Sequence, residues 1–463
     1  MRNTPDQMIA PVDAAVLPVS DPAPARTVRP FVRDDARAWY AAGVLALCQM
    51  VSFIDRQLIN LLVGPIKADF GLSDTSVSML IGFAFASIHI LLAIPFGRWI
   101  DHGNRRMIIL GCGVLWSLCS MAGGLAQTYE QLFITRMGVG AAEAGIYPAC
   151  AALVAAYFTR DRLPRAMSIM LLGPFVGGGL SLLFGGLVIG ALERAGPIVL
   201  PLVGVLAPWQ MTLIIISASG VLPVLLILTV REPPRERAVD TGGVAAPGFA
   251  PAFRYLRDRA RFYGNFYIGI GLHVMAIYAV PAWAPSLLAR RFDLTTEQVG
   301  VQLGLVSLVA GVSGMLCGPY LGALAKRRGH REASVRGARM GVAMTLPLVV
   351  LIPFMPSANA LLVLLFLLTF AYTLPLSLAS SALQEVTHDR MRGFVGAIYF
   401  VAASLAGLAL APTLVGFVTD RVFADPQQVG LSLALVVGTA GALSLVMLSR
   451  SIEGYRRCAE EQP

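Results

Sequence analysis

The decapeptide GRWIDHGNRR, residues 97–106, separates two long uncharged runs of this chain. Residues 75–97 before its charges and residues 107–129 after them contain no Asp, Glu, Lys or Arg. A helix needs roughly 20 apolar residues to cross a hydrocarbon core of ~30 Å. The decapeptide therefore predicts a short charged loop between two membrane-spanning helices.

The whole chain has the composition of an integral membrane protein. Of its 463 residues, 56% are hydrophobic and 14% are charged, and the mean hydropathy is +0.70. Such a chain is too apolar for a soluble globule. Further uncharged runs cover residues 166–192, 195–230, 262–289, 298–325, 340–384, 393–419 and 426–449. The sequence PFMPSAN divides the longest run into two spans, and with the stretches around Asp55 and Arg136 the prediction is twelve spans.

The basic residues predict the orientation of these spans. Most of the 36 Lys and Arg residues fall in the two tails, in the loops on one side and in a central linker. The positive-inside rule places that side, and both termini, in the cytoplasm. The net charge of +9 then follows from topology, and no nucleic-acid partner is expected. Residues 1–36 lack the continuous apolar segment of a signal peptide and predict a disordered cytoplasmic tail.

An internal duplication organises the spans into two halves. FGLSDTSVSMLIG, residues 70–82, returns as FDLTTEQVGVQLG, residues 292–304. Two weaker matches follow in the same order and at nearly the same spacing. The predicted domains are a six-helix bundle over 37–230, a cytoplasmic linker over 231–261, a second six-helix bundle over 262–450 and a cytoplasmic tail over 451–463.

Parallel repeats of this kind predict a transporter. They place a substrate cavity at the midplane between the halves, and movement of one half against the other exposes it to alternate sides. The basic end of the linker, FRYLRDRARF (253–262), has two interpretations. It is either an amphipathic helix on anionic lipid or a solvated segment with positive-inside charge.

Two six-span halves with GRWIDHGNRR between spans two and three resemble the major facilitator superfamily. Its signature at this place matches Gly97, Asp101, Arg105 and Arg106, while Asn104 replaces a turn glycine and tolerates the same backbone conformation. The resemblance implies an all-α membrane protein with twelve transmembrane helices in two pseudo-symmetric bundles and no cofactor. It also implies that the four matching residues form a cytoplasmic gate. Plain loop charge would explain the arginines but not Asp101.

Within this superfamily the chain is similar to the bacterial branch of the spinster family. The similarity rests on FIDRQLINLLVGPIKADFGLSDT (53–75), DHGNRR (101–106) and RMGVGAAEAGIYPA (136–149). It implies a multi-pass protein of the bacterial inner membrane. Animal members of the family are linked to the export of lysophospholipids and sphingoid phosphates, so the resemblance also implies an amphipathic anionic lipid as substrate.

Four charged residues lie inside predicted spans: Asp55 and Arg56 in span one, Arg136 and Glu143 in span four. Each costs about 2.5–3.5 kcal/mol at a helix centre before pairing. Arg136 and Glu143 share one helix face roughly 10 Å apart, whereas Asp55 and Arg56 point about 100° apart. If spans one and four meet, as in the superfamily, the four charges are expected to form two crossed acid–base pairs.

These charges suggest a proton switch. We predict Asp55 as the main proton acceptor and Glu143 as a second one. Arg56 and Arg136 are predicted as their partners and as ligands of a phosphate or carboxylate. The alternative is a static ion-pair clasp between the two spans. Function is favoured, because buried pairs stabilise poorly and intramembrane charge is usually functional.

Other features of the spans are weaker signals. GPFVGGG (173–179) resembles an antiporter motif through Gly173, Pro174, Gly177 and Gly178, but close helix packing would also explain it. His89 and His273 are more typical of hydrogen-bonded packing than of a proton relay. The six cysteines have no metal-ligand spacing, and no metal is expected.

The sequence thus favours a monomeric, proton-coupled secondary transporter of an amphipathic anionic lipid, with membrane lipids and protons as its other partners. One alternative keeps the fold and moves a small organic anion or a drug. Another is a receptor or scaffold that binds a ligand without moving it, although no sizeable soluble domain is present to report binding. An enzyme is not expected, because no nucleophile–base set or phosphate loop is found.

Overall fold

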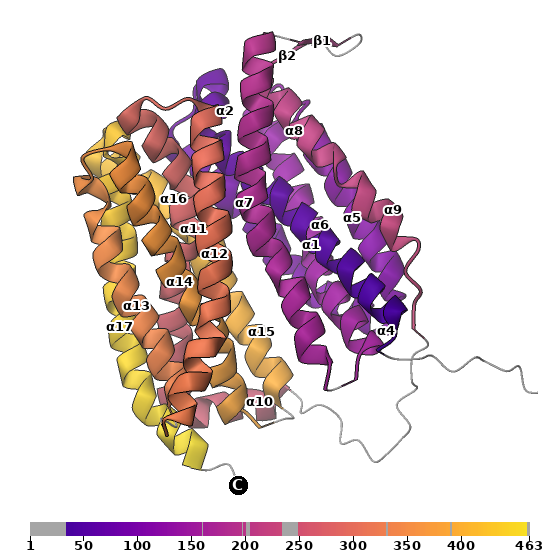
Figure 1. Ribbon diagram of the computed structural model, residues 1–463, viewed down its shortest axis with the longest axis vertical. Coiled ribbons are helices and arrows are strands. Elements are labelled where there is room, and N and C mark those ends of the chain that lie inside the picture. Colours follow the sequence, from indigo (N-terminus) through magenta and orange to yellow (C-terminus); the bar gives the residue numbers. More distant parts are fainter. Residues whose placement is uncertain are drawn as a thin grey trace, which may run out of the picture. The chain divides into compact units, whose positions relative to one another are not determined.

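The computed structural model describes residues 34–159, 161–196, 198–200, 204–233, 249–329, 332–388 and 391–460. Within these ranges, twelve helices, some of them interrupted, are long and apolar enough to cross a membrane. The all-α fold with two six-helix bundles is therefore as predicted (Figure 1). Most of the predicted N-terminal tail and much of the predicted linker lie outside the described residues.

The first half begins at Asp35, whose side chain caps the first helix by accepting from the Ala38 backbone N–H at 2.8 Å. Its helices are α1 (Ala36–Leu61), α2 (Val63–Phe70), α3 (Asp74–Ser78), the π-helical η1 (Met79–Phe83), α4 (Ala84–His102), α5 (Arg105–Gly123), α6 (Tyr129–Tyr157), α7 (Leu163–Ala195), α8 (Pro208–Ala218) and α9 (Val221–Ile227). A hairpin of β1 (Ile198–Leu200) and β2 (Gly204–Leu206) joins α7 to α8 and pairs Ile198 with Leu206.

The second half follows α10 (Phe249–Asp258), which precedes the first spanning helix of that half. Its elements are α11 (Ala260–Phe292), α12 (Thr296–Arg327), α13 (Ala333–Leu351), η2 (Ile352–Phe354), α14 (Ala358–Val386), α15 (Arg392–Ala403), η4 (Ser404–Leu410), α16 (Ala411–Val418), η5 (Thr419–Phe423), η6 (Pro426–Gln428) and α17 (Val429–Glu460). The run predicted to divide at PFMPSAN does so between α13 and α14. Ser357 caps α14 through the backbone N–H of Ala360.

The duplicated stretch forms the same turn in both halves. The residue after α2, Gly71, and the residue after α11, Asp293, both have left-handed backbone, with φ of 64° and 51°. Two residues later Ser73 and Thr295 accept from the backbone N–H three positions on, a typical N-cap. We call the end of the bundles where α3 and α12 begin the Asp74 end, and the opposite end, between α4 and α5, the Asp101 end.

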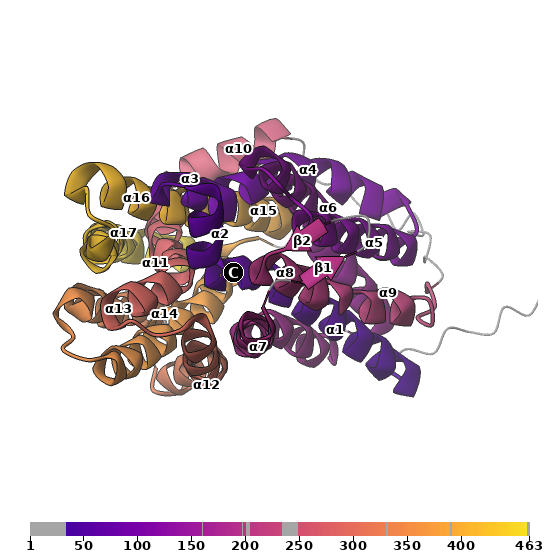
Figure 2. The same cartoon turned by 90° about the horizontal axis from the view of Figure 1, so that it is seen from above.

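The two halves meet closely along α7 and α12, which lie side by side in Figures 1 and 2. Glycines permit this approach. A Cβ on Gly186 would lie 2.9 Å from the Cα of Gly300, and one on Gly179 would lie 2.8 Å from the backbone N of Leu308. A larger side chain at either glycine would separate the helices, so the sequence of α7 determines how closely the halves pack.

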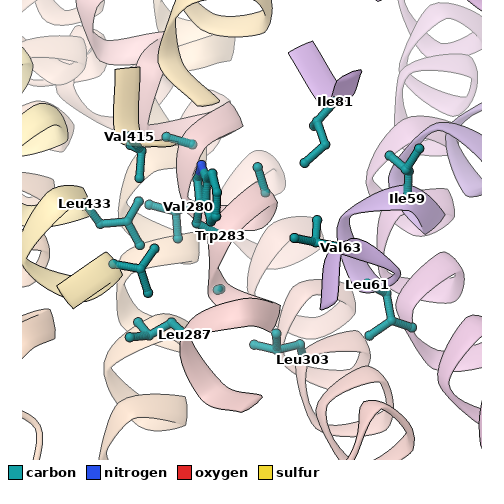
Figure 3. Close-up of a cluster of buried hydrophobic side chains, with 14 of the residues drawn as sticks. Ile59, Leu61, Val63, Ile81, Val280, Trp283, Leu287, Leu303, Val415 and Leu433 are labelled. Atoms are coloured by element: carbon teal, nitrogen blue, oxygen red, sulfur yellow. The ribbon is translucent and has the colours of Figure 1, made fainter. Parts of the chain in front are cut away.

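A shared apolar core extends across both halves near the Asp74 end. Figure 3 shows Ile59, Leu61, Val63 and Ile81 of the first half on one side of this cluster, opposite residues of the second half. Trp283 is fully buried there and donates its indole N–H to the Pro412 carbonyl at 3.0 Å. These side chains close the space between the halves at that end.

The uncharged run 195–230 contains the one span that was predicted, but the span is shorter than the run. The first part of the run forms the β1–β2 hairpin, and the helix begins only at Pro208. Gly196 and Gly204 have positive φ, 80° and 97°, and Pro208 stands at the first helical position. These residues favour a turn and a helix start. A search for uncharged runs does not detect such signals.

Candidate functional site

A cavity of about 310 Å³ lies between the two halves. In the described part of the chain its only charged lining residue is Arg56, and the wall from the second half is largely apolar and aromatic. The lining residues are Phe53, Arg56, Gln57, Asn60, Ile81, Pro174, Phe175, Gly178, Gly179, Leu182, Val274, Ile277, Tyr278, Pro281, Ala282, Ser307, Gly311, Thr369, Tyr372, Thr373, Leu376, Tyr399, Phe400, Ala403, Ser404, Leu408 and Pro412.

Arg56 connects this cavity to α6. Its guanidinium donates to the Glu143 carboxylate, and it lies 4.4 Å from the ring centroids of both Phe53 and Phe85. The Arg56 side chain is 14% exposed and that of Glu143 is 1% exposed. The sequence predicted that charges of spans one and four would meet, and this pair does so. The aromatic rings add cation–π attraction to it.

Asp55 faces away from Arg56. The second crossed pair that the sequence predicted, between Asp55 and Arg136, is not formed. Its carboxylate accepts from the indole N–H of Trp116 at 3.0 Å and from the hydroxyls of Ser120 at 2.6 Å and Ser217 at 2.5 Å. The side-chain directions on α1 explain this, because neighbouring residues point about 100° apart on a helix. Asp55 therefore lies against α5 and α8, where three donors solvate its buried carboxylate.

Arg136 is buried, 2% exposed, and its three guanidinium nitrogens have no hydrogen-bond partner among the described residues. Within the same part of the chain the Oε1 of Glu143 has none either. Buried polar groups are nearly always hydrogen-bonded, and an unpaired one is costly. The acid–base cluster in the first half thus has unused donor and acceptor capacity next to the Arg56–Glu143 pair.

The predicted gate residues lie at the Asp101 end. Gly97 has open space at its Cβ position, and Asp101 is exposed. The backbone N–H groups of Arg105 and Arg106 donate to the Glu232 carboxylate at 3.4 and 3.0 Å. Sequence reasoning did not single out Glu232, because its charge is one of many in REPPRER. A carboxylate at the start of α5 is favoured by the helix dipole.

The predicted antiporter-like motif divides between two surfaces of α7. A Cβ on Gly173 would lie 2.8 Å from the Ala46 carbonyl oxygen, and one on Gly177 would lie still closer to the Met50 carbonyl oxygen, so both glycines pack on α1. Pro174 and Gly178 line the cavity. Close packing therefore accounts for two of the four residues.

Polar ties join the halves at the Asp74 end, and sequence reasoning did not predict them. The Asp74 side chain is fully buried, and its two oxygens accept from the two terminal nitrogens of Arg290 at 2.7 Å each. Lys67 of the same half adds a bond of 2.6 Å. Asp420 of the second half accepts from the backbone N–H of Thr75 and from its hydroxyl, both at 2.6 Å.

A second ion pair at this end joins Arg194 of α7 to Glu297 of α12 at 2.5 Å.

The two histidines that the sequence analysis considered contact backbone carbonyls: Nδ1 of His89 lies 3.3 Å from Gly140 O and Nε2 of His273 lies 2.9 Å from Tyr372 O. Among the described residues no group of three or more His, Cys, Asp or Glu could hold a metal ion.

Residues 45–412 match the model of the Major Facilitator Superfamily, so the chain belongs to this family of transporters. It is similar to an MFS-type efflux pump of Mycolicibacterium smegmatis, with 29% identity over 91% of this chain and 94% of that protein. It is also similar to human protein spinster homolog 1, with 26% identity over 92% of this chain and 83% of that protein.

A solved structure has the same fold. It is a bacterial homolog of the human lysosomal transporter Spinster in an inward-facing and unoccupied conformation, with a TM-score of 0.73 and 22% identity. The match covers 92% of this chain and 98% of that one. The predicted resemblance to spinster-like transporters of the superfamily is thereby confirmed.

Proposed function

We propose that this transporter is proton-coupled and moves an amphipathic anion by alternating access. The observation that carries the proposal is the composition of the central cavity: one cation, Arg56, in the first half faces an apolar and aromatic wall from the second half. An anionic head group would bind Arg56, and an apolar tail would lie against residues such as Tyr278 and Phe400. Such a substrate is a lysophospholipid or a sphingoid phosphate.

Coupling would follow from competition for one cation. Arg56 is paired with Glu143 in this structure, and an anionic substrate would take the same guanidinium. The released carboxylate of Glu143 would be buried without a counter-charge and would neutralise by binding a proton. Arg136, whose guanidinium has no hydrogen-bond partner in the part of the chain that the structure describes, would serve as a second anion ligand. Glu143 is thus the acceptor that responds to the substrate. Asp55, whose carboxylate accepts from donors on α5 and α8, is proposed as the main proton acceptor independently of this competition.

The proposal includes the orientation of the protein in the membrane. The Asp101 end would face the cytoplasm of a bacterium, with both termini on that side of the inner membrane, because the basic loops lie there. Gly97, Asp101, Arg105 and Arg106 would form the gate of that end. The protein is proposed to act as a monomer, with both halves of the cavity supplied by one chain.

A small organic anion or a drug is the second candidate, and two observations favour it. The cavity of about 310 Å³ lies at the lower end of the range for small-molecule sites, and one relative is named an efflux pump. Both candidates require Arg56, but only a long-chain substrate needs the whole aromatic wall.

Flux into proteoliposomes under an imposed pH gradient tests the proposal. The panel contains lysophospholipids and small organic anions, and Asp55→Asn, Glu143→Gln and Arg56→Gln are compared with the parent. Gradient-driven lysolipid flux that Asp55→Asn uncouples would support the lipid substrate and the proton switch. Flux of small anions alone would select the second candidate. If both acid variants stay fully proton-coupled, the charges of spans one and four form only a structural ion-pair clasp. Binding without flux would indicate a receptor or scaffold.

A further inference from the structure

Helix α10 lies outside the transport site and exposes an aromatic ring beside several arginines. It runs across the ends of the neighbouring helices in Figure 1 and lies at the outer edge of the bundle in Figure 2. Phe253 is 66% exposed. The side chains of Arg254 and Arg257 are also exposed, as is that of Arg261 at the start of α11.

The opposite side of α10 packs on the protein. Tyr255 and Leu256 contact the apolar cluster that includes Phe262 and Tyr263. The Tyr255 and Tyr263 hydroxyls lie 3.2 Å apart, and the guanidinium of Arg259 lies 4.5 Å from the Tyr255 ring. These contacts fix the direction of the helix, so that Phe253 and its neighbouring arginines point away from the bundle.

The position of α10 along the chain places it at a membrane surface. Only Arg259 separates it from α11, a helix of 33 residues that is long and apolar enough to span. An aromatic ring beside several arginines is the pattern of a helix that lies in the headgroup region of a bilayer. The charge is also suited to that place, since Asp258 is the one acid among these exposed arginines.

We propose that α10 is a binding surface for anionic phospholipid headgroups. Phe253 inserts at the boundary between headgroups and acyl chains, and Arg254, Arg257 and Arg261 contact lipid phosphates. Because α10 continues almost directly into α11, which lines the cavity and supplies Arg290 at the Asp74 end, bound lipid would hold one end of a helix that must move during transport. The other interpretation of this segment, a solvated linker, leaves the exposure of Phe253 unexplained.

The test uses the full-length protein in detergent, titrated with phosphatidylglycerol or with phosphatidylcholine while the thermal unfolding midpoint is measured. A ligand of the native state raises the midpoint in proportion to its occupancy. The parent is expected to be stabilised by phosphatidylglycerol and much less by phosphatidylcholine. The triple variant Arg254→Gln, Arg257→Gln, Arg261→Gln is expected to bind phosphatidylglycerol on the order of tenfold to a hundredfold more weakly.

A matched control removes three exposed arginines elsewhere at the Asp101 end, through Arg327→Gln, Arg328→Gln and Arg450→Gln. Phosphatidylglycerol should raise the unfolding midpoint of this control variant almost as much as that of the parent. Phe253→Ser should weaken binding with all charges present, and Phe253→Leu should restore it. Midpoints without added lipid report whether each variant is folded.

Three results would overturn the proposal. An equal rise of the midpoint with phosphatidylglycerol and with phosphatidylcholine would show that the headgroup charge is not recognised. An equal loss of phosphatidylglycerol binding in both triple variants would show that only the total charge of the protein matters. Concentration-dependent association that Phe253→Ser abolishes would assign the surface to a second copy of the chain. None of these readouts depends on transport, so they test the lipid surface independently of the proposed substrate.

Discussion

Breaking the Asp74–Arg290 tie should shift this transporter out of the state in which the Asp74 end is closed. Arg290→Met removes two hydrogen bonds of 2.7 Å to a fully buried carboxylate and one of 3.0 Å to the Pro426 carbonyl. Lys67 remains on Asp74 at 2.6 Å, so the carboxylate keeps a counter-charge. Removing one partner of a buried charge pair costs about 2–5 kcal/mol.

The retained lysine places the expected value near the low end of that range, at about 2–3 kcal/mol. In the open state both groups are solvated and lose little by the substitution. The free-energy change therefore appears as a shift of the conformational equilibrium, by about 30-fold to 150-fold toward opening. Asp74→Asn should shift it further, because two cations then face a neutral amide. Lys67→Met should shift it least, because Lys67 and Asp74 belong to the same half.

Distances between spin labels across the Asp74 end measure this equilibrium. Gln127 and Asn359 are exposed at that end on opposite halves, and cysteines there can be labelled once the six native cysteines are replaced. Arg290→Met should add a longer distance that is rare in the parent. An unchanged distance distribution would refute the latch, and so would an equal response to Lys67→Met, since that residue makes no tie between the halves.

Three further changes have expected outcomes. Gly186→Val should lower transport at least tenfold, because its Cβ would lie 2.9 Å from Gly300 and the halves could not pack; normal flux in liposomes would contradict this. Ser217→Ala should lower the free energy of unfolding by about 1–2 kcal/mol in denaturant titrations, since a buried carboxylate loses a bond of 2.5 Å. Hydrogen bonding to Arg456 holds the pKa of Glu332 below its usual 4.5. The stabilisation is therefore present above pH 4.5 and lost as pH falls through the lower folded value. Glu332→Gln should differ from the parent by up to about 1 kcal/mol at pH 7, and this difference should shrink as the pH falls below 4.5.

The sequence predicted the spans well because length and apolarity are properties of each segment alone. It also predicted the meeting of Arg56 and Glu143, since charges within a membrane must find partners. The donors around Asp55 could not be predicted in the same way. Trp116 and Ser217 are uncharged, and they lie 61 and 162 residues from Asp55 in the chain. Only the packing of α5 and α8 against α1 brings them to its carboxylate.

The ties at the Asp74 end were missed for a different reason. Asp74 and Glu297 occur in the two copies of the duplicated stretch, which sequence reasoning used only as evidence of the repeat. Each lies in the first turn of its helix, where the helix dipole favours an acid. The helix dipole alone explains an acid at each of these two positions. Nothing in the sequence therefore pointed to arginine partners in the opposite half.

The two ion pairs that join the halves at the Asp74 end differ in strength, and the duplication does not relate them: in the aligned stretches Asp74 stands opposite Thr296, and Glu297 stands opposite Thr75. Asp74 of one half meets Arg290, and Glu297 of the other meets Arg194. Their surroundings differ: the Asp74 side chain is fully buried, whereas those of Glu297 and Arg194 are 30% and 65% exposed. An exposed pair contributes about 0–1 kcal/mol and is screened by salt. A buried pair resists separation far more, because removing one partner leaves the other charge desolvated. The closed state at this end should therefore depend on the buried pair, and salt should have little effect on it.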